Sequence, residues 1–148
     1  LEAAGARPAR WSRYGAVLTE GDPAGIPAVR ERRAGIQDEG SQLVALALAA
    51  APLEGPDRRW LDMCAGPGGK AALLAGLATD RGATLLAVER QPHRARMVEN
   101  ALRGDAGNHR VVVADATQPL PGEDPFDRVL LDAPCTGLGA LRRRPEAR

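Results

Sequence analysis

The sequence predicts an α/β fold built on a mostly parallel, doubly wound sheet, and three observations support this prediction. Short apolar runs alternate with helix-forming segments from Arg58 to the end of the chain. These runs are unbroken rather than alternating in polarity, as is typical of parallel strands covered on both faces. A glycine-rich turn follows the first run, and an acidic residue follows each of the four. Ligands of such sheets bind beyond the carboxyl ends of the strands, so the acids indicate a site there.

The N-terminal residues 1–36 are interpreted as a strap or hairpin that leads into the main domain, residues 37–148. Arginines are scattered there among prolines and glycines, and the residues predict a strand over 14–18 and a turn around "EGDPAGIP". The next segment, "QDEGSQLVALALAAAP", opens with acids and Ser41 and stops at Pro52. It predicts a helix with buried leucines.

The β-α alternation follows directly. The expected elements are a strand at 58–63, a helix at 70–78, a strand at 84–88, a helix at 92–103, a strand at 111–113 and a strand at 128–131.

Composition limits the class of protein before any motif is considered. The 148 residues are enough for one domain, and the formal net charge is only +1, so local patches must carry any argument for a polyanionic partner. No apolar run could cross a bilayer and no signal peptide is evident, which predicts a soluble, cytoplasmic protein without a membrane partner. The two cysteines, Cys64 and Cys135, offer no zinc ligand set, so no metal is expected.

The acids at the strand ends are Asp62, Glu89, Asp115 and Asp132. A single acid after a strand is usually a helix cap or a turn former. Because four of them recur at successive strand ends, we expect them to share one edge of the sheet and one ligand.

The stretch "WLDMCAGPGGK" ends the first predicted strand. Its glycines remove side chains where a backbone must approach a ligand closely. It is not a Walker phosphate loop, because Cys64 replaces the first glycine and Ala71 follows the lysine. The loose dinucleotide pattern G-x-G-x-x-A is met, with Glu89 near the distance of a ribose-binding acid. An NAD-dependent oxidoreductase therefore stays an alternative.

Four blocks resemble the Fmu/Sun family of S-adenosylmethionine-dependent RNA cytosine-5 methyltransferases. They are "QDEGSQLVA" (37–45), "DMCAGPGGK" (62–70), "ADAT" (114–117) and "DAPCTGLGALRRRPE" (132–146). The resemblance implies a Rossmann-like class I methyltransferase fold, S-adenosyl-L-methionine as cofactor, and RNA as partner, with rRNA favoured over tRNA. Two positions depart from the family pattern: Gly66, where alanine is more frequent, and Glu89, where aspartate is more frequent.

The resemblance also implies residue roles. Glu89 would bind the ribose and Asp115 the adenine. Asp132 would hold the target base and also belong to the cofactor-binding residues. The methionine moiety would lie in a cradle made by Cys64, Ala65, Gly66, Pro67, Gly68, Gly69 and Lys70. Lys70 is the only lysine of the chain, which fits a compact ammonium in a tight space.

The residues alone and the family resemblance assign different roles to Cys135. Carbon 5 of cytosine becomes nucleophilic once a thiolate adds to carbon 6. From the residues alone Cys135, after Pro134, resembles such a nucleophile. In the family, however, this cysteine assists product release and the nucleophile lies in a later Thr-Cys block.

The resembled fold has about three further strands, so the sequence is interpreted as a fragment truncated after the fourth strand. Its apolar edge would invite self-association, and the isolated chain is expected to be inactive. Arg142, Arg143 and Arg144 are candidate phosphate contacts. A noncatalytic RNA-binding or assembly fragment remains a third hypothesis.

Overall fold

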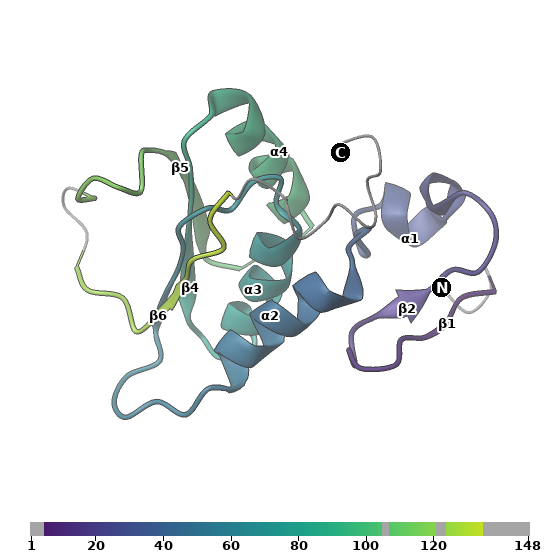
Figure 1. The fold of residues 1–148 in the computed structure, drawn as a ribbon, viewed down its shortest axis with the longest axis horizontal. Coiled ribbons are helices and arrows are strands. Elements are labelled where there is room, and N and C mark those ends of the chain that lie inside the picture. The colour runs from purple at the N-terminus through teal and green to yellow at the C-terminus, as the bar shows by residue number, and fades with distance from the viewer. Residues whose placement is uncertain (1–4, 105–106, 121–123, 135–148) are drawn as a thin grey trace, which may run out of the picture.

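The computed structural model describes residues 5–104, 107–120 and 124–134 (Figure 1). Two short strands, two short helical turns and the first long helix precede the sheet: β1 (Arg7–Pro8), β2 (Ala16–Val17), the 3-10 turn η2 (Pro23–Gly25), α1 (Pro27–Arg30) and α2 (Glu39–Ala50). The alternating part follows as β3 (Arg59–Asp62), α3 (Gly69–Thr79), β4 (Thr84–Glu89), α4 (Pro92–Leu102), β5 (His109–Val113) and β6 (Arg128–Leu130).

The main sheet has the order β5-β4-β3-β6, and all its strand pairs are parallel. The predicted α/β fold with a parallel sheet is therefore confirmed. The chain winds from β3 through β4 to β5 in one direction and then returns to the other side of β3 to form β6. This reversal makes the gap between the ends of β3 and β6 a topological switch point, where α/β sheets bind their ligands.

The two faces of the sheet are covered differently. Helices α2, α3 and α4 lie on one face (Figure 1), where Trp60, Leu74 and Leu102 are fully buried. On the other face Leu61, Leu86 and Val88 pack against apolar residues of the segment between β5 and β6, including Leu120 and Phe126. Both faces of the central strands β3 and β4 are thus shielded from water, as the unbroken apolar strands predict, whereas Val129 of β6 is exposed.

Helix α2 differs from its prediction in which side chains it buries. Its fully buried residues are Ala45 and Ala49, whereas Leu46 and Leu48 are only partly buried and Leu43 is exposed. The prediction of buried leucines was therefore wrong in this detail. The physical reason is the partner: α2 packs on α3, which presents alanines, and small residues on both helices permit a close approach.

The element ends lie within two residues of the predicted ones. Helix α3 starts at Gly69 because Gly68 has a left-handed backbone, with φ of 116°. Strand β5 starts at His109, two residues earlier than predicted, because it pairs with Leu85 of β4. The start of β5 is thus set by strand pairing, which local composition does not encode.

The N-terminal segment contains an antiparallel β1-β2 hairpin, as expected from the sequence, with Arg7 opposite Val17. The predicted strand over 14–18 is shorter, because only Ala16 and Val17 pair. Figure 1 places the hairpin and α1 on the side of the helix layer that faces away from the sheet. The domain boundary at residue 36 stays a prediction. No helix in the described ranges is long and apolar enough to cross a membrane.

A buried arginine connects β6 to the rest of the molecule. The Arg128 guanidinium is almost fully buried and donates to both carboxylate oxygens of Asp57, at 2.7 and 2.9 Å. It also donates to the carbonyls of Leu48 and Ala51, at 2.6 and 2.9 Å, at the C-terminal end of α2. The Trp60 indole N–H donates to Asp57 as well, at 2.6 Å. The hydrogen bond from Arg128 is the main cause of the lowered pKa of Asp57, so the carboxylate is ionised at neutral pH.

We expect Arg128→Leu to lower the free energy of unfolding by about 3–5 kcal/mol, because it leaves a carboxylate and two carbonyls without their charged donor. Urea denaturation measures this loss. Arg33→Leu is the matched control: Arg33 pairs with Glu31 at 2.6 Å, but on the surface, so its loss should cost less than about 1 kcal/mol. Equal costs for the two variants would contradict the role assigned to Arg128.

Candidate functional site

The loop after β3 is tied to both neighbouring strands. Met63 N–H donates to the Leu130 carbonyl at 2.9 Å, and Ala65 N–H donates to the Val88 carbonyl at 2.9 Å. The chain then passes through a cis Gly66–Pro67 peptide to Gly68. A Cβ at residue 68 would lie 2.7 Å from Ala101 Cβ, so both its backbone angle and its packing require glycine. The loop is therefore a defined structure that brings bare backbone to the end of the sheet.

Glu89, the last residue of β4, holds this loop from the other side. Its Oε2 accepts the Gly66 N–H at 3.2 Å and its Oε1 accepts the Gln91 N–H at 2.9 Å. Arg94 completes the contact: its Nη2 donates to the Gly66 carbonyl at 2.7 Å, and its Nε lies 3.6 Å from Glu89 Oε2. Glu89 is only 7% exposed. The predicted ribose acid is thus already engaged with the loop.

Asp62, the last residue of β3, is buried with one free oxygen. Its Oδ1 accepts the Cys64 N–H at 3.2 Å, whereas its Oδ2 has no hydrogen-bond partner among the described residues. Burial raises the pKa of Asp62 to about 6, and the nearby charges of Asp132 and Glu89 add to this, against the lowering effect of Lys70. An unpaired buried carboxylate oxygen is costly and indicates a site for a donor group.

Lys70 and Asp132 meet across the switch point. Lys70 lies in the first turn of α3 and Asp132 lies two residues beyond β6, and their Nζ and Oδ2 atoms are 2.7 Å apart. About half of the Asp132 side chain is exposed. The pair therefore links the loop to the fourth strand while leaving a carboxylate accessible.

Cys64 is not an activated thiol. Burial raises its pKa, and the carboxylates of Asp62, Glu89 and Asp132 raise it further. The thiolate is the nucleophilic form of cysteine, so at neutral pH Cys64 is a poor nucleophile. The role of Cys64 in the cofactor cradle stays a prediction.

Asp115 lies two residues beyond β5 and makes a local turn. Its Oδ1 accepts the Thr117 Oγ1–H at 2.7 Å and the Thr117 N–H at 3.0 Å, which together lower its pKa. Arg90 Nη1 is 3.9 Å from its Oδ2. The structure thus brings Asp62, Glu89 and Asp132 around the loop but leaves Asp115 two strands away from β3.

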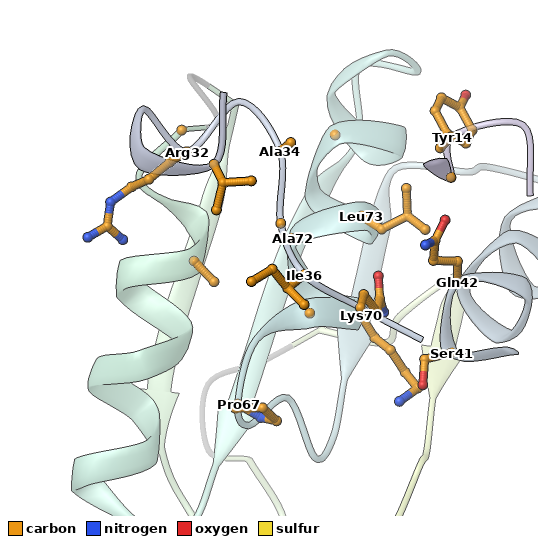
Figure 2. Close-up of a pocket in the computed structure, with 18 of the residues that line it drawn as sticks. Tyr14, Arg32, Ala34, Ile36, Ser41, Gln42, Pro67, Lys70, Ala72 and Leu73 are labelled. Carbon is orange, nitrogen blue, oxygen red and sulfur yellow. The ribbon is translucent and has the colours of Figure 1, made fainter. Parts of the chain in front are cut away.

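A cavity of about 1190 Å³ borders the loop. It extends from Pro67 and Lys70 over the outer side of α3, at Leu73, to Tyr14 and Ile36 of the N-terminal segment (Figure 2). The predicted site residues that line it are Cys64, Ala65, Gly66, Pro67, Gly69, Lys70 and Asp132. Gly68, Glu89 and Asp115 do not line it. The cavity therefore overlaps one edge of the predicted site and is not centred on the strand ends. Cys135, Arg142, Arg143 and Arg144 lie outside the described residues.

Two site residues were missed by sequence reasoning. Gln37 lines the cavity beside Gly69, and its Nε2 is buried without a hydrogen-bond partner among the described residues. Its place in the block "QDEGSQLVA" was a signal that it belongs to the site. Arg94 had no such signal, because only the fold brings it to Gly66. In the described ranges no three His, Cys, Asp or Glu residues are grouped as a metal site requires.

The parallel sheet and its site-bearing loop define the class I methyltransferase fold, which solved structures share. A methyltransferase homologue protein from Pyrococcus horikoshii has a TM-score of 0.77 and 28% identity, over 98% of this chain and 48% of that one. NSun6 from the same organism, solved with SFG, has a TM-score of 0.67 and 28% identity, over 80% and 30%.

The family model for 16S rRNA methyltransferase RsmB/F matches residues 47–148, and the chain belongs to this family. A Mycobacterium tuberculosis protein that is named as a methyltransferase is 55% identical to this chain, over 94% of this chain and 30% of that protein. Ribosomal RNA small subunit methyltransferase B of Pseudomonas putida is 36% identical over 96% and 32%. The chain spans about a third of the length of these curated relatives.

We expect Gly66→Ala to lower the free energy of unfolding by about 1–3 kcal/mol, because its Cβ would lie 2.2 Å from Glu89 Oε2 and 2.9 Å from Arg94 Nε. Adding Glu89→Asp, which shortens the side chain by one methylene, should recover part of this loss. Chemical denaturation of the two single variants and the double variant gives the coupling energy, expected to be at least about 0.5 kcal/mol.

Gly76→Ala is the control for this series. Nothing lies within 4 Å of a Cβ at residue 76, in the middle of α3, so this change should stabilise the protein by about 0.5–1 kcal/mol. Additive effects of Gly66→Ala and Glu89→Asp would contradict the direct contact between the two positions.

The raised pKa of Asp62 predicts a specific pH dependence of stability. The native state holds the Asp62 proton up to about pH 6, whereas the unfolded state loses it near the ordinary aspartate pKa of 3.8. Asp62 therefore contributes most to the free energy of unfolding below pH 3.8. This contribution, up to about 3 kcal/mol, is lost as the pH rises through 6.

Urea denaturation from pH 4 to pH 7 checks this dependence against Asp62→Asn, which cannot titrate. As the pH rises, the unchanged protein should lose free energy of unfolding relative to Asp62→Asn. A difference that is constant over this range would show that Asp62 has an ordinary pKa.

Proposed function

We propose that the chain is part of an S-adenosylmethionine-dependent methyltransferase that modifies carbon 5 of cytosine in RNA, with ribosomal RNA as the favoured substrate. The observation that carries this proposal is the glycine loop at the topological switch point, held between buried Glu89 and the Lys70–Asp132 pair. The family of the chain and the names of its relatives support the RNA substrate.

The residues present fit the proposed cofactor. The unpaired Oδ2 of Asp62 offers an acceptor to the ammonium of the methionine moiety. The loop backbone at Gly66, Pro67 and Gly69 borders the cavity, so a ligand could lie against it. The acids around the loop create a negative environment, which suits a positively charged sulfonium; after burial, the larger cause, they also raise the pKa of Cys64. NSun6, a structural neighbour, was solved with SFG, an analogue of this cofactor.

Each acid has a separate proposed task. Glu89 fixes the loop through Gly66 and presents a carboxylate at the end of β4 for the ribose hydroxyls. Asp115, preoriented by Thr117, would accept from the adenine amino group. Asp132, held by Lys70, would bind the ring edge of the target cytosine. When bound, the cofactor supplies the electrophilic methyl group.

The cysteine chemistry follows from the same environment. Addition to carbon 6 of cytosine needs a thiolate, and the raised pKa of Cys64 makes it unsuited to this step. We therefore propose that Cys64 is a loop residue and keep Cys135 in the product-release role that the family resemblance implies.

Isothermal titration calorimetry with S-adenosylhomocysteine tests the cofactor proposal. We expect saturable binding to the chain and no binding of NAD. Asp62→Asn should weaken binding about tenfold or more, because it replaces a carboxylate acceptor with an amide in a buried site.

Asp80→Asn is the matched control, since Asp80 is an exposed carboxylate at the other end of α3, and its binding should equal that of the unchanged protein. Binding of NAD in place of S-adenosylhomocysteine would refute the proposal in favour of an oxidoreductase.

A further inference from the structure

The turn between β1 and β2 is firmly anchored to α2. Glu39, in the first turn of α2, accepts the N–H groups of Trp11 and Ser12 at 2.5 and 2.8 Å. The Ser12 hydroxyl, which is buried, bonds to Gln42 Oε1 at 2.6 Å. The turn is also tight, because a Cβ at Gly15 would lie 2.7 Å from Ala9 Cβ. Residues 9–15 therefore form a defined turn on the end of a long helix.

This turn displays two aromatic rings to solvent. Trp11 is 66% exposed and Tyr14 is 48% exposed. The anchoring contacts of residue 11 use its backbone N–H, so its indole does not serve to hold the turn. Aromatic rings usually contribute to stability by removing a large apolar area from water. In this protein both rings stay outside the core.

An arginine stacks on each ring. The Arg10 guanidinium lies 4.7 Å from the Trp11 ring centre, and the Arg13 guanidinium lies 4.9 Å from the Tyr14 ring centre. Arg7 on β1 adds a third positive charge, and residues 5–17 contain no acid. Exposed aromatic rings and arginines thus alternate along this turn.

We propose that this turn, residues 9–14 with Arg7, is a docking platform for single-stranded RNA. Bases would stack on Trp11 and Tyr14 while Arg10 and Arg13 contact the phosphates. Stacking on aromatic rings combined with backbone charge is how proteins bind single strands without reading sequence. The cationic neighbours of both rings favour a polyanion over an apolar protein surface, which would have to desolvate these guanidinium groups.

The platform does not depend on the cofactor site. It uses the β1-β2 turn and the N-terminal end of α2, whereas the proposed cofactor site uses the C-terminal ends of β3, β4 and β6 together with the first turn of α3. The two are made of different residues, although Tyr14 and Gln42 line the cavity that also borders Lys70. Binding of S-adenosylhomocysteine and binding of RNA are measured separately, so failure of one proposal leaves the other intact.

Trp11 provides a direct optical signal for the test. Of the two tryptophans, Trp60 is fully buried, so a base that stacks on the surface should quench Trp11 alone. We expect titration with a single-stranded oligoribonucleotide of about ten residues to quench the fluorescence, and to show anisotropy changes when the oligonucleotide is labelled.

The variants separate stacking from charge. Trp11→Ala should weaken binding at least about fivefold, and Trp11→Phe should retain most of the affinity. Arg10→Ala with Arg13→Ala should weaken binding and reduce the slope of log affinity against log salt by about 1.4, from about 0.7 per lost phosphate contact. Arg96→Ala with Arg103→Ala removes the same charge from exposed positions in α4 and directly after it and should leave the slope nearly unchanged.

Several results would overturn the platform. They are absence of oligonucleotide binding, equal binding by Trp11→Ala and the unchanged protein, and equal salt slopes for the two arginine pairs. Quenching of Trp11 by anionic phospholipid vesicles but not by RNA would instead identify a membrane-facing surface. Far-ultraviolet circular dichroism of each variant shows whether the fold is retained, which we expect because the anchors are Glu39, Ser12 and Gln42.

Discussion

The buried guanidinium of Arg128 is the interaction on which the rest of the structure depends. Strand β6 is three residues long and pairs only with β3 in the described sheet. Arg128 donates hydrogen bonds to Asp57 and to the last carbonyls of α2. These bonds hold β6 in place, because so short a strand has few hydrogen bonds of its own. Because Asp132 follows β6 by two residues, the position of this acid beside Lys70 depends on a charge buried at the other end of the strand.

Helix α2 connects the two functional surfaces that we propose. Its last turn accepts hydrogen bonds from Arg128, and its first turn holds the Trp11 turn through Glu39. A 12-residue helix is about 18 Å long. Its alanines let it lie close against α3, the helix that carries Lys70. One rigid element therefore sets both the edge strand beside the loop and the exposed aromatic turn.

The charges around the loop are mainly negative. Asp62, Glu89 and Asp132 surround Cys64, while Lys70 and Arg94 provide only partial compensation. Such an environment keeps a thiol protonated and favours a cationic ligand. Burial and three of the four acids that recur along the sequence thus keep the Cys64 thiol protonated at neutral pH.

The sequence by itself determined the parallel sheet, the loop and the acids at the strand ends, because unbroken apolar runs, glycine clusters and strand-end residues are local patterns. Only the tertiary structure decided which acid faces which group. Arg128 and Asp57 are 71 residues apart, and Gly66 and Glu89 are 23 apart. The two departures from the family pattern, Gly66 and Glu89, proved to touch, because the longer carboxylate occupies the space of the absent methyl group. Contacts of this kind depend on how strands and helices pack, and no local pattern encodes that packing.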